Sequence, residues 1–255
     1  MKKVLLTITL IAFATISTLA QCYGITFDEL EVTEENAADI FGDGLASYNP
    51  SQNMLTLQAG FDYHLSTNFV TINTGRDFII RLEGDAAIYA AIECGDNLSI
   101  ETARPFTLKI TANISGSALK CPNLMVNDNV TLDLLSRNSS SELHALDCTG
   151  ELIMNNAILT AEVTTARLAV AAQRMTLNGC WLQRPKGGSI NPAEGGICFG
   201  DGTAAKIVRI TTEGYGIEEN EQLDEESQVL KCFENGQIVI IRNRQKYNVA
   251  GQRIF

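Results

Sequence analysis

A four-residue motif returns at a fixed interval in the middle of the chain, and this repeat limits the possible folds more than any other feature. The copies are Ala91-Ile92-Glu93-Cys94, Ala118-Leu119-Lys120-Cys121 and Ala145-Leu146-Asp147-Cys148, 27 residues apart each time, and a divergent copy, Leu168-Ala169-Val170-Ala171, follows after 23 residues. A repeat of this length cannot bury its apolar face alone, so successive repeats must stack on one another. The chain is therefore expected to form a solenoid.

Two further strand patterns accompany the motif. One occurs at Val70-Thr71-Ile72, Leu98-Ser99-Ile100, Leu124-Met125-Val126, Leu152-Ile153-Met154 and Met175-Thr176-Leu177, and the other at Phe78-Ile79-Ile80, Phe106-Thr107-Leu108, Val130-Thr131-Leu132 and Ile158-Leu159-Thr160. Apolar residues at every second position are typical of half-buried strands. Three short strands in each repeat predict one coil of a right-handed parallel β-helix. A β-sandwich, the alternative all-β fold, would not require a fixed period.

Identical residues at equivalent positions of stacked coils should form ladders along the solenoid. Asparagine follows the first of these strand patterns in four copies, at Asn73, Asn127, Asn155 and Asn178. Asparagine tolerates the left-handed backbone of a corner, and stacked amides can hydrogen-bond to one another. The cysteines of the motif, Cys94, Cys121 and Cys148, should point inward as small buried thiols rather than form disulfides.

Composition changes divide the chain into five expected parts. Lys2, Lys3, the apolar stretch 4–16 and small residues before position 21 are typical of a signal peptide. Seven acidic residues and no basic ones in 213–226 indicate a solvated linker. The predicted parts are a signal peptide (1–20), an N-terminal cap (21–62) with a short helix over 33–40, the β-helix (63–212), an acidic linker (213–227) and a C-terminal hairpin tail (228–255).

The charge and hydropathy of the chain restrict its partners and location. A net charge of −11 argues against nucleic acid, whose binding depends on cationic side chains. No second apolar run is long enough to cross a membrane, so no transmembrane segment is expected in the mature chain. We expect an exported protein, located in the periplasm, on the outer-membrane surface or outside the cell. A lipid anchor on Cys22 is the alternative, although Gln21 precedes it where Gly, Ala or Ser is usual.

No catalytic or metal site is evident in the sequence. Glycoside hydrolysis needs a pair of carboxylates flanking the scissile bond, and the nearest fragment is Asn127-Asp128-Asn129, whose first residue is already explained as a corner. Seven cysteines without a Cys-x-x-Cys spacing argue against zinc. No cofactor is therefore predicted. Calcium at Asp201, in Phe199-Gly200-Asp201-Gly202, stays open beside a plain turn.

A saccharide-binding role would require aromatic rings on the outer faces of the coils. The candidates are Trp181, Tyr89 and Tyr63. For Trp181, which follows Cys180, packing beneath the loop 183–188 is the alternative. A row of exposed rings would favour binding, whereas three or more carboxylates converging on one face would favour an enzyme.

Two segments resemble known bacterial sequences. Val32-Thr33-Glu34-Glu35-Asn36-Ala37-Ala38-Asp39-Ile40, with Ser47-Tyr48-Asn49-Pro50 and Met54-Leu55-Thr56-Leu57 after it, resembles the start of uncharacterised secreted right-handed β-helix proteins of gut Bacteroidetes and some Firmicutes. The tail from Glu234-Asn235-Gly236 to Gly251-Gln252-Arg253 is similar to C-terminal tails of exported Bacteroidales proteins and to sorting domains of type IX secretion. Some relatives in this broad class bind plant polysaccharide with calcium.

These observations predict an exported, non-enzymatic binding or structural module of the cell envelope or secretome. Polysaccharide or a component of the cell envelope is the expected partner. The alternative is a carbohydrate-active enzyme, either a polysaccharide lyase or a glycoside hydrolase, since both occur on β-helices.

Overall fold

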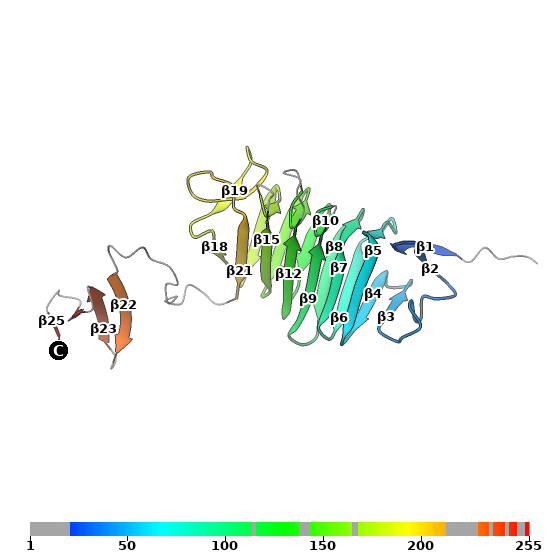
Figure 1. The fold of residues 1–255 in the computed structure, drawn as a ribbon, viewed down its shortest axis with the longest axis horizontal. Coiled ribbons are helices and arrows are strands. Elements are labelled where there is room, and N and C mark those ends of the chain that lie inside the picture. Colours follow the sequence, from blue (N-terminus) through cyan, green and yellow to red (C-terminus); the bar gives the residue numbers. More distant parts are fainter. Residues whose placement is uncertain are drawn as a thin grey trace, which may run out of the picture.

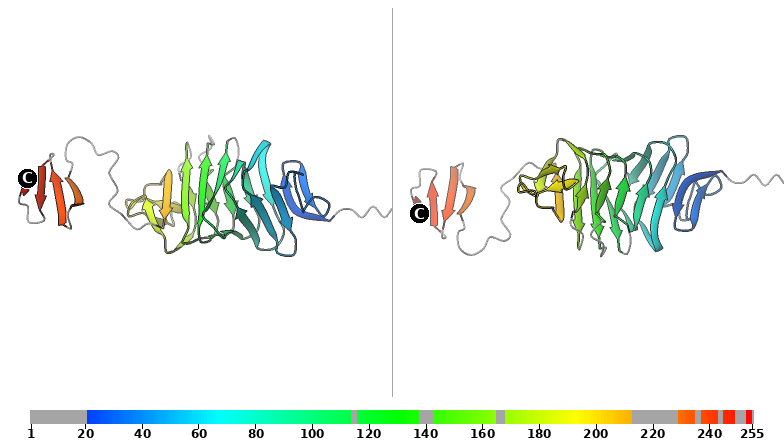
Figure 2. Two further views of the ribbon diagram at one scale, coloured as in Figure 1. Left: turned by 90° about the horizontal axis from the view of Figure 1, so that it is seen from below. Right: turned by 90° about the horizontal axis from the view of Figure 1, so that it is seen from above.

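The computed structural model describes residues 21–113, 116–137, 143–164 and 168–212, and the backbone of four strands between residues 229 and 254. The predicted signal peptide and acidic linker lie outside the described residues. Within them every regular element is a β-strand, and parallel strands stack into a solenoid of about five coils, a right-handed β-helix as predicted. Figure 1 and Figure 2 show these strands side by side along the long axis of the body.

Each coil contributes one strand to each of three faces. Face 1 consists of β4 (Met54–Gln58), β6 (Phe78–Glu83), β8 (Leu98–Thr102), β11 (Leu124–Val126), β14 (Glu151–Asn155) and β17 (Arg174–Asn178). Face 2 consists of the first halves of β5 (Phe61–Ile72) and β7 (Ala86–Cys94), followed by β9 (Phe106–Ala112), β12 (Val130–Ser136) and β15 (Ile158–Val163). Face 3 consists of the second halves of β5 and β7, followed by β10 (Leu119–Cys121), β13 (Leu146–Cys148) and β16 (Val170–Ala171).

The 27-residue period appears directly in the pairing register. Leu119 is the Cα partner of both Ile92 and Leu146. All three side chains are buried, so the apolar positions of the motif form one inward row. Alternate residues of faces 1 and 2 extend this core, which therefore runs as one continuous cluster through the stacked coils.

Two register assignments from the sequence are wrong. Val70-Thr71-Ile72 pairs with the motif strand in β7, on face 3, and the face-1 neighbour of Leu98-Ser99-Ile100 is Phe78-Ile79-Ile80. The fourth motif copy is shifted by one residue, because Val170 rather than Ala169 is the partner of Leu146. Both errors arise because residues paired between neighbouring coils lie 20 to 28 positions apart, so no single period aligns every copy.

The N-terminal end of the stack is covered by antiparallel strands, and the predicted helix over 33–40 is absent. β1 (Cys22–Phe27) pairs with β2 (Leu30–Thr33) and β5, and β3 (Ala46–Asn49) pairs with β4. Residues 34–38 form turns and residues 39–45 form bends. Ile40 N–H donates to Ala46 O and Tyr48 N–H donates to Ala37 O, so this segment bonds to the open edge of β3. A segment this short forms a marginal helix, and bonds to a sheet edge outweigh the capping signals.

The parallel stack begins earlier than the sequence indicates, because β4, which was expected to belong to the cap, already pairs in parallel with β6. At the other end the chain reverses. β21 (Ile207–Thr211) runs antiparallel to β15 and pairs with β18 (Trp181–Arg184). β20 (Gly196–Cys198) and β19 (Ser189–Asn191) extend face 3.

The C-terminal tail forms a separate four-stranded antiparallel sheet. The predicted hairpin is present as β23 (Gln237–Arg242) and β24 (Gln245–Asn248). β22 (Val229–Glu234) and β25 (Arg253–Ile254) flank it, so the tail is larger than the predicted two strands.

Candidate functional site

The asparagine ladder forms at three of the four predicted positions. Asn155 donates from Nδ2 to Asn127 Oδ1 at 3.0 Å and accepts from Asn178 Nδ2 at 2.7 Å. Asn73 is not part of this ladder, because it follows the strand that lies on face 3. Glu101 occupies the corresponding position one coil before Asn127 and pairs with Arg81. The equivalent position of the earlier coil is therefore occupied by an ion pair and not by an amide.

A second ladder at another corner has no counterpart in the sequence predictions. Asn97 donates to Asp77 Oδ1 at 2.8 Å, and Asn123 donates to Asn97 Oδ1 at 2.7 Å. Asn123 Oδ1 in turn accepts the backbone N–H of Glu151 at 2.8 Å. The signal available in the sequence was the Asn that directly precedes Leu98 and Leu124.

The cysteine ladder is present on face 3. Cys121 is the Cα partner of Cys148, and the β7–β10 register places Cys94 on the other side of Cys121. All three are buried thiols outside any disulfide. Burial raises the pKa of the Cys94 thiol to about 11. A hydrogen bond between the two side chains raises the pKa of Cys121 and lowers that of Cys148. These thiols serve packing.

The three aromatic candidates lie in different places and form no row. The Tyr63 ring packs edge-on against Phe27, with ring centroids 5.3 Å apart, and its hydroxyl donates to Phe27 O. Tyr89 stacks on His64 at 4.1 Å. Trp181, at the opposite end of the body, has 44% of its surface exposed. Of the three rings, Trp181 is the one that offers a largely open face.

A pocket of about 510 Å³ lies at the C-terminal end of face 2 and is the candidate site. Residues of β15, β18 and β21 line it, together with the two residues that follow β18. Phe199, whose side chain is 42% exposed, also lines it. We call it the C-terminal pocket, and its lining residues are Thr160, Glu162, Gln183, Arg184, Pro185, Lys186, Phe199, Ile207 and Arg209.

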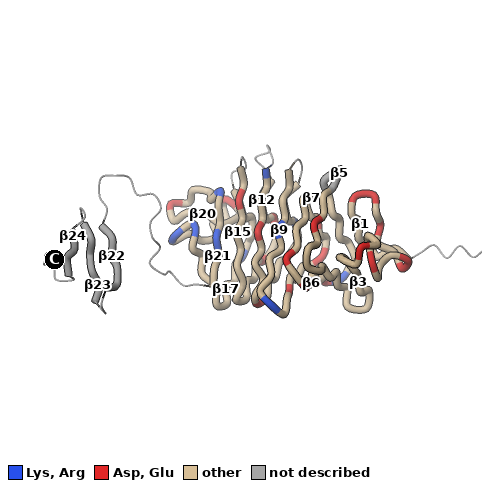
Figure 3. Tube along the Cα trace, turned by 60° about the horizontal axis from the view of Figure 1, so that its bottom comes forward, with Lys and Arg blue, Asp and Glu red and all other residues tan. Residues whose placement is uncertain are grey.

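The C-terminal pocket is basic although the chain is acidic. Arg184, Lys186 and Arg209 line it together with one carboxylate, Glu162. Figure 3 shows basic residues gathered around β20 and β21, at this end of the body. Pockets of this size accommodate small ligands or short polymer segments. The lining provides positive charge, one hydroxyl and one exposed ring. It did not emerge from the sequence because its residues come from four separate segments.

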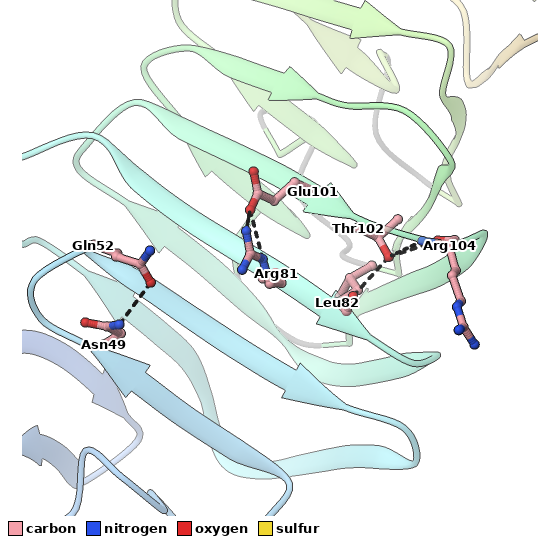
Figure 4. A network of polar contacts seen from close by, with 7 residues as sticks. All are labelled: Asn49, Gln52, Arg81, Leu82, Glu101, Thr102 and Arg104. Carbon is pink, nitrogen blue, oxygen red and sulfur yellow. Dashed lines mark hydrogen bonds and ion pairs between the residues drawn. The ribbon is translucent and has the colours of Figure 1, made fainter.

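A second pocket of about 450 Å³ lies on the outer side of face 1 and contains three carboxylates. Glu83, Glu101 and Asp128 line it, and Glu101 is engaged by the guanidinium of Arg81, which donates from Nε at 2.9 Å. Figure 4 shows this ion pair, and beside it the Thr102 hydroxyl bonded to the backbone. We call this cavity the carboxylate pocket.

The described part of the chain contains no group of three or more His, Cys, Asp or Glu side chains that could hold a metal ion. Asp201 accepts the Thr203 N–H at 2.8 Å, the bond expected of a turn. That hydrogen bond lowers the pKa of the Asp201 carboxyl.

Among the described residues, no helix has the length and apolar character needed to cross a membrane.

The chain was also compared with known proteins. Searches against protein-family models, curated proteins and solved structures found no match in any of the three.

Proposed function

We propose that the protein is an exported, non-enzymatic binding module that holds a segment of polysaccharide in the C-terminal pocket. The observation that carries this proposal is the exposed Phe199 ring within a pocket of about 510 Å³. Sugar rings present C–H groups that pack on aromatic faces, and the neighbouring hydroxyl and guanidinium groups can bond sugar oxygens. The pocket contains a single carboxylate, whereas glycoside hydrolysis uses two.

The rigidity of the scaffold supports this role. Every face-2 strand is hydrogen-bonded to its neighbours, from β7 through β9, β12 and β15 to β21. A site on such strands is held in position before the ligand arrives, which reduces the entropic cost of binding. A solenoid also offers an elongated surface along which a polymer can extend.

A binding assay with a ring deletion tests the proposal. Purified protein is screened on a glycan array, and the best ligand is titrated by calorimetry. We expect Phe199→Ala to weaken binding about 10- to 100-fold, since burial of an aromatic ring contributes roughly 1.5–3 kcal/mol. Leu30→Ala is the matched control, because Leu30 is an exposed apolar side chain on β2. Absence of any glycan ligand, or equal affinities of the two variants, would contradict the proposal.

The carboxylate pocket favours a second candidate function, a carbohydrate-active enzyme. Three carboxylates and Arg81 in one cavity resemble the groups that lyases and hydrolases require. The test is release of reducing ends or unsaturated sugar from a panel of polysaccharides. If the enzyme proposal holds, Glu83→Gln and Asp128→Asn should each abolish product release, whereas Phe199→Ala should not. Inactivity of the native protein across the panel would reject this candidate.

A further inference from the structure

Two arginines of the C-terminal pocket stand opposite each other on neighbouring strands. Arg184 of β18 and Arg209 of β21 are Cα partners in an antiparallel pair. Both residues are exposed and line the same cavity. Side chains of directly opposed residues start only about 5 Å apart, and like charges in this arrangement destabilise a sheet.

Three other outward cations of this solenoid pair with carboxylates. Arg81 pairs with Glu101, Lys120 with Asp147, and Arg174 with Glu151, each across neighbouring coils. These ion pairs are easy to form because the chain has 30 acidic and 19 basic residues. Among the residues that the structure describes, neither Arg184 nor Arg209 forms an ion pair with a carboxylate.

The unfavourable pairing is relieved when an anion lies between the two groups. A guanidinium offers a planar fork of N–H donors that matches the two oxygens of a carboxylate or of a sulfate. Two opposed forks can therefore hold one anionic group from both sides. Phe199 and Thr160 line the same cavity and could contact the sugar ring that carries this group.

We propose that the ligand of the C-terminal pocket is an acidic saccharide, whose uronate carboxylate or sulfate ester is held between Arg184 and Arg209. This inference rests on the proposed polysaccharide-binding function and adds the charge class of the ligand. Carboxylate and sulfate present the same chemistry to the two guanidinium groups, and the assay below distinguishes them.

Calorimetric titration with matched saccharides tests this inference. The probes are oligomers of a uronic acid, the same oligomers with their carboxyl groups reduced to alcohols, and a sulfated neutral oligosaccharide. The native protein should bind the uronate or the sulfated oligomer at least tenfold more tightly than the neutral oligomer. Binding should weaken as salt is raised, because the interaction is ionic.

Arginine substitutions locate the effect. Arg184→Gln and Arg209→Gln should each reduce affinity for the acidic oligomer about 10- to 100-fold and reduce affinity for the neutral one by a much smaller factor, because only the acidic oligomer loses an ionic contact. Arg184→Lys keeps the charge but not the fork, and should retain part of the affinity. Arg104→Gln is the control, because Arg104 is exposed outside the C-terminal pocket. Thermal melting confirms that each variant is folded, and loss of the like-charge contact should leave the melting temperature of Arg209→Gln equal to or above the native value.

The outcomes separate this inference from the proposal on which it rests. Preference for an acidic oligomer that disappears in the Gln variants supports both. Equal affinity for acidic and neutral oligomers, unaffected by the Gln substitutions, overturns the acidic class and leaves polysaccharide binding intact. Failure of every oligomer to bind the folded native protein overturns both.

Discussion

Three cysteines of the core show that successive coils place a small side chain at the same buried position. Cys94, Cys121 and Cys148 occupy equivalent positions on face 3, where the next coil has Ala172. Thiol and methyl groups are both small enough for the narrow interior beside the motif strand. Because these thiols are buried, their protonation is coupled to folding.

The pKa of Cys94 predicts a loss of stability at alkaline pH. Its value is about 11 in the folded protein against an ordinary value of 9.0. The folded chain thus retains a proton that the unfolded chain releases, and stability should decrease as pH rises from 9 to 11, by roughly 1–3 kcal/mol. Urea denaturation of the native protein and of Cys94→Ala at several pH values should give a flatter dependence for the variant. Met154→Ala, a buried truncation without a titrating group, should retain the native pH dependence. Identical slopes for native protein and Cys94→Ala would contradict the assignment.

At the scale of elements, the strand pairing of the central coils could be predicted from the sequence, whereas that of the first coils could not. The motif fixes the register of β7, β10 and β13 because its copies keep a constant spacing. The face-1 strands β8, β11, β14 and β17 also pair as predicted. β5 and β6 were misassigned because both read as apolar alternation, and alternation does not tell one face of a solenoid from another. The face becomes known only when the lengths of the intervening corners are known.

The candidate site was less accessible to prediction than the fold. The rings were predicted because saccharide binding needs aromatic side chains on the outer faces, but Tyr63 packs against Phe27. The C-terminal pocket depends on the reversal of chain direction at β21, which places Arg209 opposite Arg184. No local signal in the sequence anticipates this pairing, since it joins residues from an antiparallel closure and not from the repeat.

The asparagine ladder allows a graded test of corner stability. Asn155 forms two ladder hydrogen bonds, whereas Asn178 at the end of the ladder forms one. We expect Asn155→Ala to lower the free energy of unfolding by about 1–3 kcal/mol and Asn178→Ala by about half of that, because each net hydrogen bond contributes roughly 0.5–1.5 kcal/mol. Urea denaturation of the two variants measures the difference. Equal losses, or no loss in either variant, would show that the ladder does not stabilise the corner.

For the whole molecule, stability depends on contacts between neighbouring coils. Each coil buries its inward residues only against the coils on either side. A destabilising substitution in a central coil therefore removes packing contacts from both neighbouring coils. The ends lack one neighbour, and antiparallel strands replace it: β1, β2 and β3 at the first coil, and β18, β20 and β21 at the last. This closure is also what creates the C-terminal pocket, which links the capping of the solenoid to its proposed function.

A charge placed inside a central coil is therefore expected to unfold the body as a unit. Leu146 is fully buried between Leu119 and Val170 in the stack. Leu146→Asp removes an apolar side chain and buries a carboxylate without a partner, which should cost at least about 4 kcal/mol. Met125→Asp adds the same carboxylate at an outward position of β11, where the side chain is 36% exposed, and should cost less than about 1 kcal/mol. Far-ultraviolet circular dichroism during thermal melting compares the two variants. If both melt at the native temperature, Leu146 does not face the interior and the stacked arrangement of the coils is wrong.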